Sequence, residues 1–138
     1  MRKWGESMAR ERQGDKPKLE PIENRVYRFV VRVIKLVRAL PKDDMAAQII
    51  AHQLLKSATS IGANVEEALG AVSRRDFAHK MSISAKEARE AHYWLRLLRD
   101  GEIMPAHFLV DIVDESLQIS KILRATVRSA KSSEDEKK

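Results

Sequence analysis

The chain has 138 residues, which suits a single domain with one hydrophobic core. It contains no cysteine, so disulfides and thiolate metal sites are excluded. Lys and Arg number 26 against 20 Asp and Glu, and the net charge of +6 leaves room for an acidic partner. The basic N-terminus lacks the apolar stretch of a signal peptide, and no segment is apolar over the length of a membrane span. We therefore expect a cytoplasmic protein without a membrane partner.

The two ends of the chain lack apolar periodicity. Residues 1–20 are polar and contain Pro17 and two glycines, so they are predicted to form a flexible basic arm. The polar residues 131–138 are predicted to form a disordered tail for the same reason. Residues 21–130 remain for the folded domain.

The folded domain begins with two stretches whose apolar residues recur at helical spacing. The first is predicted over residues 22–40, with Pro21 in its opening turn. Asp43 or Asp44 can cap the second, because either carboxylate accepts a hydrogen bond from a backbone N–H at a helix start. Gly70 offers a left-handed end to this second helix.

Two further helices follow the same pattern. Ser73 and Asp76 have the spacing of a capping box, which opens the third helix, and Gly101 closes it. Pro105 opens the fourth helix, whose apolar side starts at Phe108. Each connection is too short to cross a bundle, so neighbouring helices should run antiparallel. The predicted fold is all-α: an antiparallel up-down-up-down four-helix bundle.

Catalytic and metal-binding motifs are missing from this pattern. A di-metal site in a bundle needs paired Glu-x-x-His motifs, and the nearest approach is a single Asp76-x-x-His79. No nucleophile elbow, phosphate-binding glycine loop or dinucleotide fingerprint occurs. We therefore expect no enzyme activity, no metal and no cofactor.

Four polar residues border the apolar stripes of the second and third helices: Ser57, Asn64, Ser84 and Glu87. A buried polar group without a partner costs about 1–3 kcal/mol. These residues are therefore predicted to bond one another between helices and to fix the packing register. The alternative is a polar pocket in which Glu67, Glu87 and Glu90 act as acid or base, but that pocket lacks a second reactive group.

The first predicted helix carries four cations at three- and four-residue steps: Arg25, Arg28, Arg32 and Lys35. They form one stripe opposite the core face, where like charges repel and an anionic partner such as nucleic acid would relieve the repulsion. The alternative is an ordinary solvated helix face whose side-chain stems cover apolar surface. Three cations of the third helix are further candidate contacts: Arg89, Arg96 and Arg99.

Apolar side chains also lie outside the predicted core stripes. Tyr27, Val31 and Ile34 form a flank on the first helix, and Trp94 is a similar feature of the third. Because neighbouring helices cover each helix of a bundle only in part, such residues indicate a subunit interface. Self-association is therefore predicted.

Residues 57–98 resemble a known protein family. The matching segments are Ser60-Ile61-Gly62-Ala63-Asn64-Val65-Glu66-Glu67, Asp76-Phe77, Lys86-Glu87-Ala88-Arg89-Glu90 and Tyr93-Trp94-Leu95. They resemble the bacterial four-helix bundles encoded in intervening sequences of large-subunit ribosomal RNA genes. The resemblance implies a cytosolic bundle that assembles as a pentamer and has no known enzymatic activity. The family is also similar to the accessory variability determinants of diversity-generating retroelements, which are pentameric barrels that bind nucleic acid and a reverse transcriptase.

These features combine into one hypothesis: a non-enzymatic homo-oligomer, with a pentamer implied by the resemblance. It would bind RNA, DNA or a nucleoprotein such as a reverse transcriptase through its basic helical faces. Contacts to phosphates would make the binding salt-sensitive and weakly sequence-specific. The alternative is a protein-interaction adaptor that engages a partner protein through the apolar flank and binds no nucleic acid.

Overall fold

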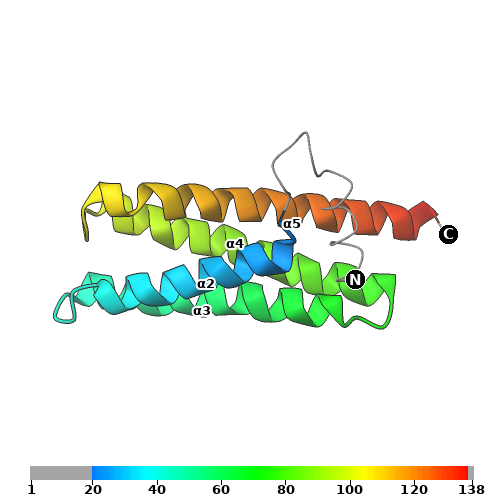
Figure 1. Cartoon of the computed structure of the whole chain (residues 1–138), viewed down its shortest axis with the longest axis horizontal. Coiled ribbons are helices and arrows are strands. Elements are labelled where there is room, and N and C mark those ends of the chain that lie inside the picture. The colour runs from blue at the N-terminus through cyan, green and yellow to red at the C-terminus, as the bar shows by residue number, and fades with distance from the viewer. Residues whose placement is uncertain (1–19, 137–138) are drawn as a thin grey trace.

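A computed structural model describes residues 20–136, and in this range it contains long α-helices and no strands (Figure 1). The predicted arm over residues 1–20 lies outside the described residues, apart from Glu20. No helix within the described range combines the length and the low polarity that crossing a bilayer requires. The elements are α2 (Ile22–Ala39), α3 (Met45–Leu69), α4 (Arg74–Asp100), the short 3-10 helix η1 (Ala106–Phe108) and α5 (Val110–Glu136).

The long helices pack side by side into an elongated bundle (Figure 1). α2 packs against α3 and α5, and α4 packs against the same two helices, with the most extensive interfaces of the molecule. Consecutive long helices run antiparallel, so the predicted all-α four-helix bundle is confirmed. Because the helices follow one another around the bundle, the face between α2 and α3 lies opposite the face between α4 and α5.

The starts of α3 and α4 are held by side-chain caps. Asp44, one of the two candidate caps, accepts a hydrogen bond from the Ala47 N–H at 3.0 Å. Ser73 Oγ accepts a hydrogen bond from the Asp76 N–H, also at 3.0 Å. Each bond satisfies a backbone donor that has no partner within the helix. Both cap predictions are therefore confirmed.

The end of α3 differs from the expected geometry, whereas α4 ends at Gly101 as predicted. Gly70 has φ −96°, so the predicted left-handed end is wrong; the chain leaves α3 through a tight turn in which the Gly70 N–H donates to the Glu67 carbonyl at 3.1 Å. After α4 the left-handed residue is Glu102, with φ 56°, and not Gly101, with φ −79°. A glycine is needed at 101 for another reason, because a Cβ there would lie 2.8 Å from the Leu97 carbonyl oxygen.

The fourth helix starts later than predicted. Pro105 precedes η1 and not α5, and Phe108 in η1 is 62% exposed, so its assignment to the apolar stripe was wrong. Leu109 is fully buried in its place. A 3-10 turn has three residues per turn where an α-helix has 3.6, and this tighter winding changes the direction in which each side chain points.

The C-terminal helix also ends later than predicted. α5 runs to Glu136, so the expected disordered tail is wrong for residues 131–136, and residues 137–138 lie outside the described range. Contacts with α4 explain the extension, because Ala130 is buried and Arg74 of α4 donates a hydrogen bond to Ser133.

Small residues line the contact between α3 and α4. Ala58 on α3 and Ala88 and Ala91 on α4 are 0–1% exposed. Since the distance between helix axes depends on side-chain size at the contact, alanines allow the two helices to approach closely. Gly62 of α3 faces α2, and a Cβ there would meet a Val30 methyl carbon at an ordinary 3.5 Å.

Candidate nucleic-acid interface

The basic stripe of α2 is partly neutralised within the bundle. Arg25 donates two hydrogen bonds to Glu115 of α5, from Nε and from Nη2, each at 2.7 Å. These bonds hold the pKa of the Glu115 carboxyl below its usual value and raise the pKa of Arg25. Arg28 is paired with Glu20 just before the helix. Two of the four cations predicted to contact nucleic acid therefore already have carboxylate partners.

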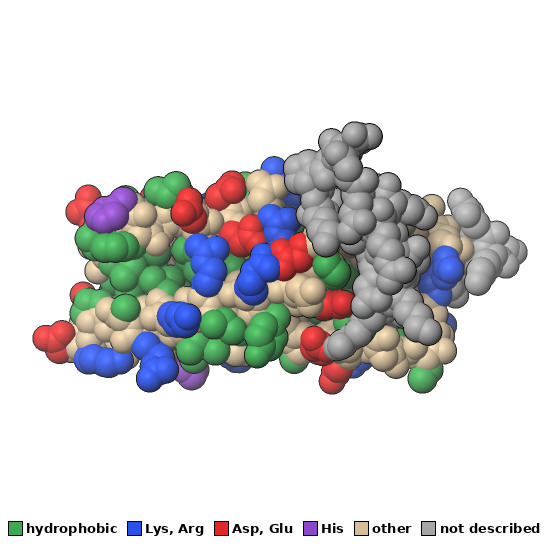
Figure 2. All heavy atoms as spheres, in the orientation of Figure 1, with side chains coloured by type: hydrophobic (Ala, Val, Ile, Leu, Met, Phe, Trp, Pro, Cys, Tyr) green, Lys and Arg blue, Asp and Glu red, His purple; other side chains and the backbone are tan. Residues whose placement is uncertain are grey.

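The rest of the α2 stripe, Arg32 and Lys35, is exposed. Its surroundings are acidic, since the neighbouring part of α5 carries Asp111, Asp114 and Glu115. Figure 2 shows Lys and Arg side chains next to Asp and Glu side chains between α2 and α5. This mixture of charges lowers the positive potential that the sequence of α2 alone predicts.

The three candidate cations of α4 have different surroundings. Arg99 pairs with the adjacent Asp100, with Nε 2.8 Å from Oδ1. The guanidinium carbon of Arg96 lies 5.7 Å from the ring centroid of Tyr93, which places the cation over the ring. Arg89 is exposed and forms no ion pair with a carboxylate of residues 20–133. Of the three, only Arg89 keeps an unpaired and uncovered charge in the described part of the chain.

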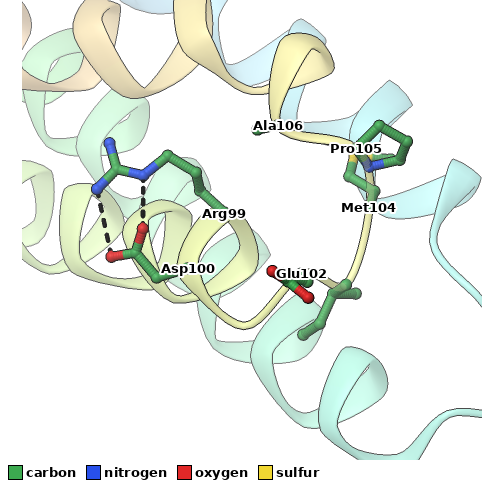
Figure 3. Close-up of a pocket in the computed structure, with 7 residues that line it drawn as sticks. Arg99, Asp100, Glu102, Met104, Pro105 and Ala106 are labelled. Atoms are coloured by element: carbon green, nitrogen blue, oxygen red, sulfur yellow. Dashed lines mark hydrogen bonds and ion pairs between the residues drawn. The ribbon is translucent and has the colours of Figure 1, made fainter.

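A hollow at the end of α4 offers no chemistry of its own. Figure 3 shows Arg99 and Asp100 bonded to each other on one side of it, and Glu102 with the connection to η1 on the other. Within the described residues, no three His, Asp or Glu side chains converge as metal ligands would. The hollow is lined by Arg99, Asp100, Glu102, Ile103, Met104, Pro105 and Ala106.

A second basic surface, which sequence reasoning missed, lies between α4 and α5. We call it the α4–α5 basic face: Lys86 and Arg89 on α4, and Lys121, Arg124 and Arg128 on α5. All five side chains are exposed, and none forms an ion pair with a carboxylate of residues 20–133. The two helices are close here, because Arg124 and Arg128 line a shallow groove together with Ser82 and Ala85 of α4.

Carboxylates of α4 point away from this face. Glu90 accepts a hydrogen bond from the Trp94 indole N–H at 3.2 Å. Burial raises the pKa of Glu87, which lies on the α3 side of the helix near Lys56. On α5, no acidic residue occurs between Glu115 and Glu134. The α4–α5 basic face is therefore a surface of one sign, unlike the α2 stripe.

The matches to known proteins cover most of this bundle. Residues 21–125 match the family model described as 23S rRNA-intervening sequence protein. The chain belongs to this family. It is also similar to a crystal structure, at 1.70 Å resolution, of a protein of unknown function from the S23 ribosomal protein family of Bacteroides thetaiotaomicron VPI-5482. The two share 35% sequence identity over 78% of this chain and 98% of that chain, with a TM-score of 0.71. Comparison with curated proteins gives no match.

In this member of the 23S rRNA-intervening sequence protein family, the inner polar residues do not bond one another as predicted. Ser57 Oγ donates to the Gln53 carbonyl at 2.8 Å, and the Asn64 amide donates to the Ser60 carbonyl at 2.9 Å, both within α3. Carbonyls one turn earlier on the same helix are the nearest acceptors, and they satisfy these side chains without a partner helix. Of the three inner polar residues Ser57, Asn64 and Ser84, only Ser84 forms a hydrogen bond to another helix.

Ser84 links α4 to α3 by a hydrogen bond. Its hydroxyl, fully buried on α4, donates to the Ile61 carbonyl of α3 at 2.9 Å. Glu67, one of the carboxylates considered as an acid or base, lies 3.0 Å from the Lys80 ammonium and so joins the same two helices. The predicted role in packing register therefore belongs to Ser84, and the prediction was wrong for Ser57 and Asn64.

The apolar flank of α2 is accessible in the single chain. Tyr27 is 68% exposed and Ile34 is 37% exposed, while Val31 is half-buried. Figure 2 shows hydrophobic side chains gathered where α2 borders α3. Trp94 differs, because it is half-buried against the bundle's own core. Self-association of this family member stays a prediction, and the flank of α2 is the more exposed of the two predicted surfaces.

Proposed function

We propose that the protein is a non-enzymatic, homo-oligomeric bundle that binds nucleic acid through the α4–α5 basic face. One observation carries this proposal: five exposed cations share this face and none has a carboxylate partner among residues 20–133. Like charges held this close repel one another, and the negative charges of a row of phosphates relieve that repulsion. Binding also releases the counterions that were condensed on the nucleic acid, which favours the complex. The proposal replaces Arg25, Arg28 and Arg99 as the main contacts, because each already has a carboxylate partner.

The family supports this proposal without deciding it. Its name refers to the ribosomal RNA genes in which the proteins were noticed, and the similar crystal structure is of a protein of unknown function. The resemblance to the retroelement determinants favours RNA or DNA as the ligand, within a complex that includes a nucleoprotein such as a reverse transcriptase. Contacts to phosphates alone carry no sequence information, so binding should be salt-dependent and weakly specific.

The proposed oligomer uses the opposite side of the bundle. The exposed Tyr27 and Ile34 lie on the α2 side, where a second copy can cover them without blocking α4 and α5. The pentamer implied by the resemblance is part of this proposal. Ile34→Glu should lower the mass measured by light scattering, because it places a charge in a desolvated contact. An unchanged mass would remove α2 from the interface.

The nucleic-acid site is tested with two triple variants that change the net charge equally. One replaces Lys121, Arg124 and Arg128 by Glu, and the other replaces Arg28, Arg32 and Lys35 by Glu. Fluorescence anisotropy with a mixed pool of RNA and DNA at several salt concentrations gives the affinity, and circular dichroism checks helicity. We expect the α5 variant to lose at least about 100-fold in affinity and the α2 variant far less.

The α2 variant is the matched control, because a loss caused only by net charge would be the same in both. An equal loss in the two variants would contradict the assignment to α4 and α5. Wild-type protein that ignores nucleic acid at low salt would favour the adaptor alternative instead. The adaptor is recognised by salt-insensitive association with a partner protein that is lost in Val31→Glu or Ile34→Glu.

A further inference from the structure

We infer that the nucleic acid held by the α4–α5 basic face is a duplex, with one phosphate row along the cations of α4 and the other along those of α5. This inference rests on the proposed function and narrows its ligand to a double strand. The shared chemistry is a pair of phosphate rows, which a DNA duplex and an RNA duplex both supply.

The cations form two rows because they stand on two neighbouring helices. On α5, Arg124 and Arg128 line a shallow groove together with Ser82 of α4. Lys86 and Arg89 stand four and seven residues after Ser82, so helical spacing places them on the same side of α4. Axes of packed helices lie about 8–10 Å apart. A single strand presents one row of phosphates and neutralises one row of cations well, whereas the two strands that border a groove of a duplex match both rows.

The spacing along α5 agrees with this arrangement. Lys121 and Arg128 are seven residues apart, which corresponds to about 10 Å along a helix with a rise of ~1.5 Å per residue. Each strand of a duplex places one phosphate about every 3.4 Å of its axis. The row on α5 therefore spans about three phosphates of one strand, and Arg124 serves the middle of that span.

The face lacks the aromatic platform on which single strands stack their bases. Among the Phe, Tyr and Trp side chains of α4 and α5 in the described residues, Tyr93 alone is exposed, at 45%. Its ring is already engaged, since it forms a T-shaped pair with Trp94 at a centroid distance of 5.0 Å and Arg96 lies over it. Stacking contributes much of the affinity for single strands, so the face favours a ligand whose bases are already stacked on each other.

The experiment compares four labelled 20-mers of one mixed sequence with the full-length protein: a DNA duplex, an RNA duplex and the two matching single strands. Fluorescence anisotropy gives each affinity between low and moderate salt. We expect at least one duplex to bind about 10-fold tighter than either single strand. If all five cations contact phosphates, log K should fall with log salt at a slope of about −4.5 for the DNA duplex.

Two double variants test the rows separately: Lys86→Gln with Arg89→Gln on α4, and Lys121→Gln with Arg124→Gln on α5. Each should flatten the slope for the duplex by about 2 and bring duplex affinity close to that of the single strand. Arg32→Gln with Lys35→Gln on α2 is the matched control, and Gln keeps these exposed helix positions compatible with folding.

The outcomes separate the two proposals. Tighter binding of a single strand, or loss of duplex binding from one row only, would overturn the duplex and leave nucleic-acid binding in place. Failure of all four ligands to bind would overturn both. A preference of DNA duplex over RNA duplex, or the reverse, identifies which groove width fits the two rows.

Discussion

At the scale of single residues, the ion pair between Arg25 and Glu115 connects α2 to α5. The side chains are 29% and 21% exposed, so water screens the pair only in part. Two parallel hydrogen bonds fix the guanidinium against the carboxylate, and such bidentate pairs are the stronger kind. The pair therefore stabilises the position of α2 against α5.

Glu115→Gln should lower the free energy of unfolding by about 1 kcal/mol at neutral pH, because Arg25 loses a charged partner. The hydrogen bonds from Arg25 hold the pKa of Glu115 below its usual value of 4.5, so its contribution is present above about pH 4.5 and is lost as pH falls through the folded-state pKa. Urea unfolding at pH 7 and in acid measures both effects. Asp111→Asn, on the same helix, is the control, and equal midpoints for Glu115→Gln and wild type at pH 7 would contradict the role.

The basic residues show where sequence reasoning succeeds and stops. Spacing alone placed Arg25, Arg28, Arg32 and Lys35 on one helix face, but the carboxylate that pairs with Arg25 lies 90 residues away in the sequence. The spacing of Lys121, Arg124 and Arg128 already indicated a row of cations on α5. The zero net charge of the C-terminal region drew attention away from this row. Residues 103–138 contain six cations and six carboxylates, so their net charge is zero. The carboxylates nevertheless stand at the two ends of α5, and the row of cations lies between them.

At the scale of elements, the cap of α4 is a local device that the sequence reveals. Ser73→Ala should cost about 1 kcal/mol of stability, because the Asp76 N–H loses its acceptor. Ser82→Ala is the matched control, since the same chemical change in the middle of α4 should be neutral or slightly stabilising. Thermal unfolding of the two variants measures the difference. An equal loss in both would show that the cap is not the cause.

Helix starts were easier to predict than helix ends because their signals are chemically specific. A Ser or Asp that accepts a backbone hydrogen bond depends on a few neighbouring residues, and Ser73 and Asp44 act as their sequence indicated. The end of α5 depends on a contact with Arg74 at the start of α4, which is 59 residues away in the sequence. Long-range contacts of this kind leave no local pattern, so the extension to Glu136 could not be read from the tail's polar composition.

At the scale of the whole molecule, α2 is the least firmly held of the long helices. It has 18 residues where α4 has 27, and its interfaces with α3 and α5 are smaller than those of α4 with the same two helices. Fewer buried contacts mean a lower free energy of local opening. Amides of α2 should therefore exchange with deuterium faster than the central amides of α4. Hydrogen exchange measured by mass spectrometry tests this, and equal protection would mean that the bundle opens as one unit.

The bundle itself was predictable because periodicity, short connections and helix caps all agreed. Which surfaces the bundle exposes was harder to predict, since side chains of two successive helices, α4 and α5, combine to make one face. Lys86 and Arg89 become part of a larger basic face only because α5 packs beside α4 and adds Arg124 and Arg128. The family match covers residues 21–125 of the bundle and identifies no site residue.

The unpaired cations of α4 and α5 also bear on the stability of the folded protein. A folded state that holds like charges together is penalised by their repulsion, and the unfolded chain escapes that penalty by spreading them apart. A ligand that binds only the folded state shifts the folding equilibrium by mass action. Under the proposed function, an occupied molecule would therefore resist proteolysis better than an empty one, and the abundance of the protein in a cell would follow the supply of nucleic acid.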